Sequence, residues 1–268
     1  MKLNKKLYLL VFLFSFPSLL PAQKNEVIKN ASLITHNIAK MLEVLHYESI
    51  VYNDSFSAVL YKNSFAGYDP SKMVFLQQDI EDLSEYRLNL DNELKGNTPV
   101  FYKELGALYE KRVLESEAIV NKILQDKFNV LNTGSNFNLN RNLADFPLNY
   151  HEKEALWKDF LTYQFLNLLT DEPDSLLKLQ QPITEEQEEA AKKIIIEIQQ
   201  RRFKKMKEEF SEEIYLGKFL NSMIHMLDPH SNYLLPIERR NFEEGLGGVY
   251  YGIGALLKEN AVKVEIGE

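Results

Sequence analysis

The sequence predicts a mainly α protein: a multi-helix N-terminal domain followed by the first β-hairpin of a second domain. Apolar residues recur every three or four positions through most of the chain, which is typical of helices that bury one face. Asn, Gly and Pro gather at 132–149, where this spacing stops, and predict a loop. Near the C-terminal end the spacing changes to two, since apolar and charged residues alternate from Val262 to Ile266.

The first apolar stripe predicts a helix from Glu26 to Tyr47. Asp54 is a preferred capping residue and is expected to begin a short helix over 55–63. Gly67 and the following Asp69-Pro70 predict the turn that ends this second helix.

The next stretch, MVFL at 73–76, predicts a brief extended link. Apolar spacing then predicts a helix over 80–94 that Gly96 ends. Pro99 is expected at the first position of the next helix, where its missing N–H costs nothing, and that helix is predicted to continue through 101–128.

After the loop, spacing predicts a helix over 151–169. Thr184 and Gln187 have the spacing of a capping box ahead of a highly charged helix that reaches about Phe210. Ser211 is a candidate cap for a further helix, which we expect to end at Asp228-Pro229.

One more short helix is predicted between Pro236 and Gly245, because proline favours the start of a helix and glycine its end. Two strands follow, 253–257 and 262–266, with Glu259-Asn260 as their turn. An isolated hairpin is marginally stable because it leaves its apolar face uncovered. We therefore expect residues 246–268 to be the start of a truncated domain.

The first residues have the features of a secretory signal. Three lysines precede the apolar run LYLLVFLFSF, and Leu20-Pro21-Ala22 resembles a cleavage site. We expect a signal peptide at 1–22, an exported and periplasmic protein, and a mature helical domain at 24–245. An uncleaved N-terminal anchor is the alternative; either way this segment is the only predicted membrane contact.

Composition narrows the function classes. The chain has no cysteine, which excludes disulfides, thiolate metal sites and a lipid-modified cysteine. Its net charge is −8, and it becomes −11 when the three lysines of the signal are removed. Such a surface disfavours nucleic acid and anionic lipid as partners.

The segment HMLDPHSNY brings four potentially reactive residues close together in sequence: His225, Asp228, His230 and Ser231. A metal site would need a third converging ligand, and Pro229 redirects the chain between the two histidines. A Ser/His/Asp triad normally draws its members from distant segments. The favoured interpretation is a helix end and turn in which Asp228 or Ser231 bonds free backbone groups, and we expect no metal and no cofactor.

The basic run RRFKKMK at 201–207 suggests a docking patch for a partner. Its helix also places acids four residues before bases, as in Glu197 and Arg201, which favours a solvated helix face. The solvated face is the preferred interpretation.

A second candidate site lies at the predicted hairpin. Glycines allow consecutive backbone N–H groups to surround a carboxylate, and an adjoining strand can pair with an extended peptide. The residues that fit this description are Gly252, Ile253, Gly254, Ala255, Leu256 and Leu257. A β-bulge at the start of a strand would give the same pattern.

Residues 227–257, LDPHSNYLLPIERRNFEEGLGGVYYGIGALL, resemble the tail-specific proteases, also called carboxy-terminal processing peptidases. The resemblance continues in 46–83 and in the helix that starts PVFYKELGALYEKR. It implies an exported precursor with a helical N-terminal region, a PDZ domain and a protease domain with a serine and lysine pair.

The resemblance also implies that Gly252 to Ala255 receive the C-terminal carboxylate of a substrate, while Leu256 and Leu257 begin the strand that pairs with it. The implied partners are C-terminal tails of proteins, together with a possible adaptor protein. No residue matches the catalytic serine or lysine, so we expect the protease domain to be absent and this chain alone to be inactive. The competing function is a non-catalytic helical adaptor, and a further rival is an enzyme that acts through His225, Asp228 and His230.

Overall fold

The computed structural model describes residues 30–126, 137–141, 143–170, 184–247, 256–259 and 264–267. The described chain is mainly helical, as the apolar spacing predicts. Its elements, in chain order, are α2 Ala31–Leu45, α3 Asp54–Tyr68, α4 Gln77–Asp82, the 3₁₀ helix η1 Ser84–Tyr86, α5 Leu90–Leu94, α6 Phe101–Ile123, α7 Tyr150–Thr170, α9 Glu185–Glu208, α10 Glu212–Ile224, α11 Pro236–Gly247, β1 Leu256–Glu259 and β2 Val264–Gly267.

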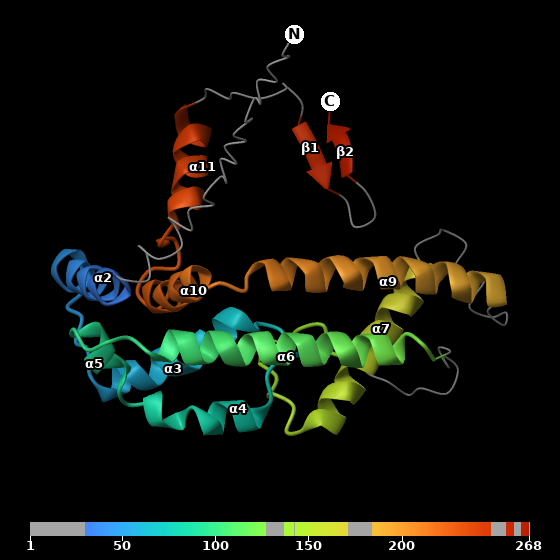
Figure 1. Ribbon diagram of the computed structural model, residues 1–268, viewed down its shortest axis with the longest axis horizontal. Coiled ribbons are helices and arrows are strands. Elements are labelled where there is room, and N and C mark those ends of the chain that lie inside the picture. Colours follow the sequence, from blue (N-terminus) through green and yellow to red (C-terminus); the bar gives the residue numbers. More distant parts are fainter. Residues whose placement is uncertain are drawn as a thin grey trace, which may run out of the picture.

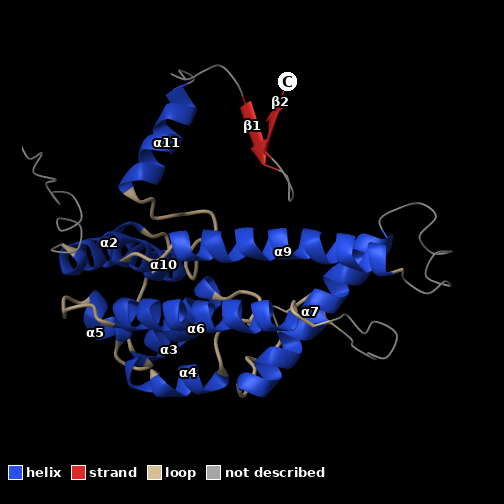
Figure 2. Cartoon of the chain, turned by 45° about the vertical axis from the view of Figure 1, so that its right-hand side comes forward, coloured by secondary structure: helices blue, strands red, loops and turns tan. Residues whose placement is uncertain are grey.

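Two long helices, α6 and α9, run side by side through the helical body (Figure 1). At one end α10 packs on both α3 and α6, and α2 packs on α5. At the other end α7 crosses the pair obliquely and contacts both long helices (Figure 2). The helical body thus has a continuous apolar core that extends along α6.

The core depends on close approach of backbones. A Cβ atom on Gly106 of α6 would lie 2.2 Å from the ring of Tyr215 in α10. Only glycine leaves room for that aromatic ring. A Cβ atom on Gly67 would lie 2.8 Å from Oγ of Ser222, so this glycine serves the contact between α3 and α10.

Several predicted helix boundaries differ from those in the structure. Asn53, rather than Asp54, caps α3, because its side chain accepts a hydrogen bond from the Phe56 N–H at 3.0 Å. The helix predicted over 55–63 is longer in the structure, since α3 continues to Tyr68, and it ends at the predicted Asp69-Pro70 turn with Asp69 as its C-cap. Pro99 lies before α6 instead of opening it; Val100 and Phe101 donate their backbone N–H groups to the Glu93 carboxylate.

The single helix predicted over 80–94 is instead three short helices, α4, η1 and α5. Asp79 caps the start of α4 by accepting the Leu76 N–H, and Asn89, which precedes α5, donates its side-chain amide to the Glu85 carbonyl. The end near Gly96 is confirmed, and this glycine has a φ of 121° that favours glycine.

Other predicted features are confirmed. Thr184 and Gln187 form the capping box of α9, and the Ser211 side chain accepts from the Ile214 N–H at the start of α10. The buried segment 73–76 is non-helical. Pro236 opens α11, and this helix lies apart from the helical body (Figure 1).

Strands β1 and β2 pair in an antiparallel register that places Leu256 opposite Gly267 and Glu259 opposite Val264. The predicted start of the first strand, 253–255, lies outside the described residues, and β1 continues past the predicted end at Leu257 to Glu259. Asn260 of the predicted turn lies outside the described residues. The predicted signal at 1–22 and Phe128 also lie outside them.

Candidate functional site

The predicted peptide-binding residues are only partly placed by the structure. Gly252, Ile253, Gly254 and Ala255 lie outside the described residues. Leu256 and Leu257 are the first two residues of β1, where they pair with Gly267 and Ile266. Within the described residues, β1 has one paired neighbour, so its other edge has no partner strand.

The turn at 225–233 is built around Asp228. Its carboxylate accepts the His230 N–H at 2.9 Å and the Ser231 hydroxyl at 2.5 Å. These bonds, with Ser231 first, hold the pKa of Asp228 below its usual range. The predicted structural turn is therefore confirmed.

The same geometry does not favour catalysis or metal binding at this turn. His225 Nε2 lies 2.8 Å from Oδ1 of Asn232, whereas Ser231 bonds directly to Asp228. No bond between Ser231 and a histidine activates the hydroxyl in this arrangement. In the part of the chain that the structure describes, no group of three potential ligands is placed to hold a metal ion.

The basic run at 201–207 is largely engaged in contacts. Arg201 pairs with Glu197 at 3.8 Å, as predicted, and Lys207 pairs with Glu117 of α6 at 2.7 Å. The guanidinium of Arg202 stacks over Phe160, 4.8 Å from the ring centroid. Lys204 and Lys207 are exposed, as a solvated face requires, whereas Arg202 packs on an aromatic ring and Phe203 is 1% exposed, so only part of the run is a solvated face.

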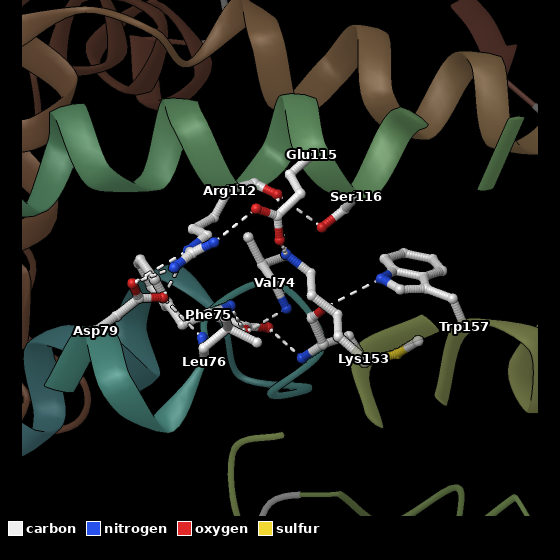
Figure 3. Close-up of polar contacts among 11 residues, drawn as sticks. Val74, Phe75, Leu76, Asp79, Arg112, Glu115, Ser116, Lys153 and Trp157 are labelled. Carbon is white, nitrogen blue, oxygen red and sulfur yellow. Dashed lines mark hydrogen bonds and ion pairs between the residues drawn. The ribbon is translucent and has the colours of Figure 1, made fainter. Parts of the chain in front are cut away.

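A buried network of charged side chains was missed by the sequence analysis (Figure 3). It joins α4, α6 and α7 around the segment 73–76. Asp69, only 3% exposed, anchors that segment by accepting the N–H groups of Met73, Val74 and Phe75 at 2.7 to 3.0 Å. Burial raises the pKa of Asp69, although these bonds and the Lys153 charge act in the opposite direction.

Arg112 connects the buried Asp79 to the partly buried Glu115. It binds the carboxylate of Asp79 through Nε and Nη2, with distances of 2.8 to 3.1 Å, and donates to Glu115 at 2.6 Å. Burial alone would lower the pKa of Arg112, but Asp79 and Glu115 raise it above its usual value. A bidentate pair of this kind fixes orientation as well as charge.

Lys153 completes the network from α7. Its side chain is fully buried, and its Nζ donates to Glu115 at 3.0 Å and to the Arg112 carbonyl at 3.3 Å. Burial lowers the pKa of Lys153, and Glu115 only partly offsets this effect. One turn later, Trp157 Nε1 donates to the Met73 carbonyl at 3.0 Å.

A lysine with a lowered pKa beside a serine invites comparison with a nucleophile and base pair. Ser116 Oγ, however, donates to the Arg112 carbonyl at 2.7 Å, the same atom that receives Lys153. Both side chains are buried, so a peptide has no access to them. The network is therefore a structural framework that locks three helices to the 73–76 segment.

Periodicity provided a signal for this framework. Lys153 lies on the stripe that also contains Trp157, Leu161 and Phe165, all buried. Arg112 similarly lies on the stripe of α6 that contains buried Leu105, Tyr109 and Ile119. A charged residue on an apolar stripe predicts a buried ion pair, because an unpaired charge there would be too costly.

Two comparisons with known proteins relate this architecture to a family. Residues 38–237 match the family model described as the tail specific protease N-terminal domain. That match includes the buried network and the Asp228 turn, and it ends at the second residue of α11.

The second comparison concerns a full-length relative. The tail-specific protease of Haemophilus influenzae is 25% identical over 240 residues, which cover 89% of this chain and 32% of the relative. The chain thus spans about a third of the length of that relative. Because the family model covers most of the chain, the chain belongs to the tail-specific protease N-terminal domain family.

Proposed function

We propose that this chain is the N-terminal region of an exported serine endopeptidase that recognises proteins by their C-terminal tails. The family match over 38–237 is the observation that carries the proposal. The relative from Haemophilus influenzae, named a tail-specific protease, supports it. In this proposal the helical body is a framework, and peptide recognition begins in the segment after α11.

The proposed recognition site is the start of a PDZ domain. Gly252 to Ala255 would surround the terminal carboxylate with backbone N–H groups. The edge of β1 that lacks a partner among the described residues supports the rest of the proposal, because an extended peptide pairs with such an edge. Leu256 and Leu257 would then begin the strand that the substrate tail extends.

The proposed chemistry lies outside the described helical body. The family resemblance implies a serine nucleophile with a neutral lysine as general base, and burial is the physical means of keeping a lysine neutral. Lys153 is buried for another reason, because it pairs with Glu115 inside the framework. Export is part of the same proposal and depends on the predicted signal at 1–22. Among the described helices, none is long and apolar enough to cross a membrane.

Binding to the native protein tests the recognition step. We expect a fluorescent peptide with apolar C-terminal residues to bind with its carboxylate free and at least about tenfold more weakly when that carboxylate is amidated, since one charge-assisted interaction is lost. Gly254→Asp should abolish the preference by repelling the carboxylate. Gly247→Asp is the matched control, because a side chain there meets no atom within 4 Å.

Equal binding of the free and amidated peptides would contradict the proposal. Protein partners bound in folded form, with no preference for a free C-terminus and no hydrolysis by the native protein, would instead support the helical adaptor.

A further inference from the structure

A short extended segment lies along α10. This segment, residues 232–235, follows the Asp228 turn and leads into α11, and we call it the strap. Tyr233 and Leu235 are partly buried, while Leu234 between them is exposed. Such alternation is typical of an extended chain that turns one face towards a neighbour. The neighbour of the strap is α10.

Three residues of α10 with helical spacing contact the strap. Gly217, Asn221 and the C-cap His225 are each four residues apart, so they share one face of the helix. His225 Nε2 lies 2.8 Å from Oδ1 of Asn232, at the start of the strap. Asn221 contacts the middle of the strap, and Gly217 contacts its end. The strap therefore runs back along α10 in the opposite direction.

Asn221 makes the central contact. Its Oδ1 accepts the Tyr233 N–H at 2.7 Å, and its Nδ2 donates to the Tyr233 carbonyl at 3.0 Å. A side-chain amide that bonds both backbone groups of one residue replaces the pair of bonds that a neighbouring strand would make. Both residues are partly buried, and Tyr233 packs against the apolar core. Loss of this amide would leave two backbone groups without their partners.

Gly217 allows the strap to approach α10. A Cβ atom on this glycine would lie 3.2 Å from Cδ2 of Leu235. Apart from the backbone of the helix itself, the three atoms nearest to that Cβ belong to Leu235 and Tyr233. A larger side chain at 217 would therefore meet the strap first.

The strap in turn sets the start of α11. The Leu235 N–H is bonded to the Glu238 carboxylate at 2.8 Å, and the Leu235 carbonyl accepts the Arg239 N–H at 2.8 Å. Every residue of α11 is exposed, and the helix points away from the helical body (Figure 1). In the described part of the chain, no backbone–backbone hydrogen bond joins the strap to the helical body. The direction of α11 therefore depends on side chains that hold the strap.

We propose that Asn221 is the positioning residue for α11. Its two bonds to Tyr233 hold the strap on α10 and so fix the direction in which the chain leaves the helical body. The inference goes beyond the proposed function, since it concerns where the segment after α11 is held and not what that segment binds. Under the proposed function, Asn221 also places the peptide-binding segment relative to the helical body.

Two spin labels measure the direction of α11 in the native protein without any peptide. The chain has no cysteine, so Leu114→Cys on α6 and Arg240→Cys on α11 each place one label at an exposed position. We expect one narrow distribution of distances between the labels. Asn221→Ala should widen this distribution at least about twofold, because α11 then samples several directions.

A matched control and a second variant accompany this measurement. Asn89 also donates its side-chain amide to a backbone carbonyl, that of Glu85, but it lies before α5. Asn89→Ala should therefore leave the distance distribution narrow. Gly217→Val should widen it, because the larger side chain displaces Leu235 from α10.

Hydrogen exchange separates release of the strap from unfolding of the helical body. Asn221→Ala should raise the exchange rate of the Tyr233 amide at least about tenfold, since that N–H loses its acceptor. The amides of α6 should exchange as in the wild type.

Three results would overturn the proposal. The first is a broad distance distribution in the protein that keeps Asn221, which means that the strap does not hold α11. The second is a narrow distribution in both Asn221→Ala and Gly217→Val, which means that other contacts fix the direction of α11. The third is exchange in Asn221→Ala that rises equally in α6 and in the strap, which makes Asn221 a residue of general stability. Because no peptide is present, these results are separate from failure of the peptide-binding proposal.

Discussion

The framework around Arg112 and the turn around Asp228 are both dense in charged residues, yet they differ in burial. Asp79 is 1% exposed and Lys153 is fully buried, whereas Asp228 is only partly buried and Ser231 is exposed. In both places carboxylates hold backbone N–H groups. The comparison teaches that reactive residue types in the sequence indicate polar contacts, while burial decides how much stability depends on those contacts.

The largest expected effect comes from breaking the framework. Arg112→Leu leaves the Asp79 carboxylate buried without its bidentate partner, which should lower the free energy of unfolding by about 3 to 5 kcal/mol. Urea unfolding followed by helical circular dichroism measures this. Arg239→Leu removes an exposed pair with Glu243 and should cost no more than about 0.5 kcal/mol; equal losses in the two variants would contradict the comparison.

A packing change should have the next largest effect. Gly106→Ala places a Cβ atom against the ring of Tyr215, so α6 and α10 must separate or the ring must move. We expect a loss of about 1 to 3 kcal/mol in the same unfolding measurement. Gly247→Ala meets nothing within 4 Å and should be neutral or slightly stabilising. A neutral Gly106→Ala would show that the contact between α6 and α10 is loose.

The framework should also influence stability in acid. Although burial opposes it, Lys153 and Arg112 lower the pKa of Glu115 below its ordinary value of 4.5. The unfolded chain therefore binds the proton more readily, and the stability from this group is present above pH 4.5 and lost as pH falls through the folded pKa. Glu115→Gln should be less stable than wild type at pH 6, by an amount that shrinks towards pH 3.

Unfolding midpoints measured between pH 3 and pH 6 check that prediction. Asp228→Asn is the comparison variant, because the pKa of this carboxyl is also lowered but the residue is only partly buried. Its pH-dependent difference from wild type should be smaller. A larger pH effect from Asp228→Asn would place the acid-sensitive contacts in the turn.

Sequence patterns predicted the helix starts that depend on residues close together in the chain. The capping box at Thr184, the cap at Ser211 and the start of α11 follow from backbone groups that a nearby side chain can satisfy. The break of 80–94 into three helices was not predicted, because the long-range contact between Asp79 and Arg112 helps to fix α4. The framework itself joins residues that are far apart in sequence, which periodicity alone does not connect.

The smallest expected effect concerns the Asp228 turn, and it tests the central claim that the helical region supplies a framework and no hydrolytic site. Purified residues 24–268 should be incubated with a peptide that ends in apolar residues, and its cleavage followed by mass spectrometry. We expect no turnover, and no change with Ser231→Ala, because Ser231 bonds to the Asp228 carboxylate and to neither histidine of the turn. Measurable cleavage that disappears in the Ser231→Ala variant would contradict the claim.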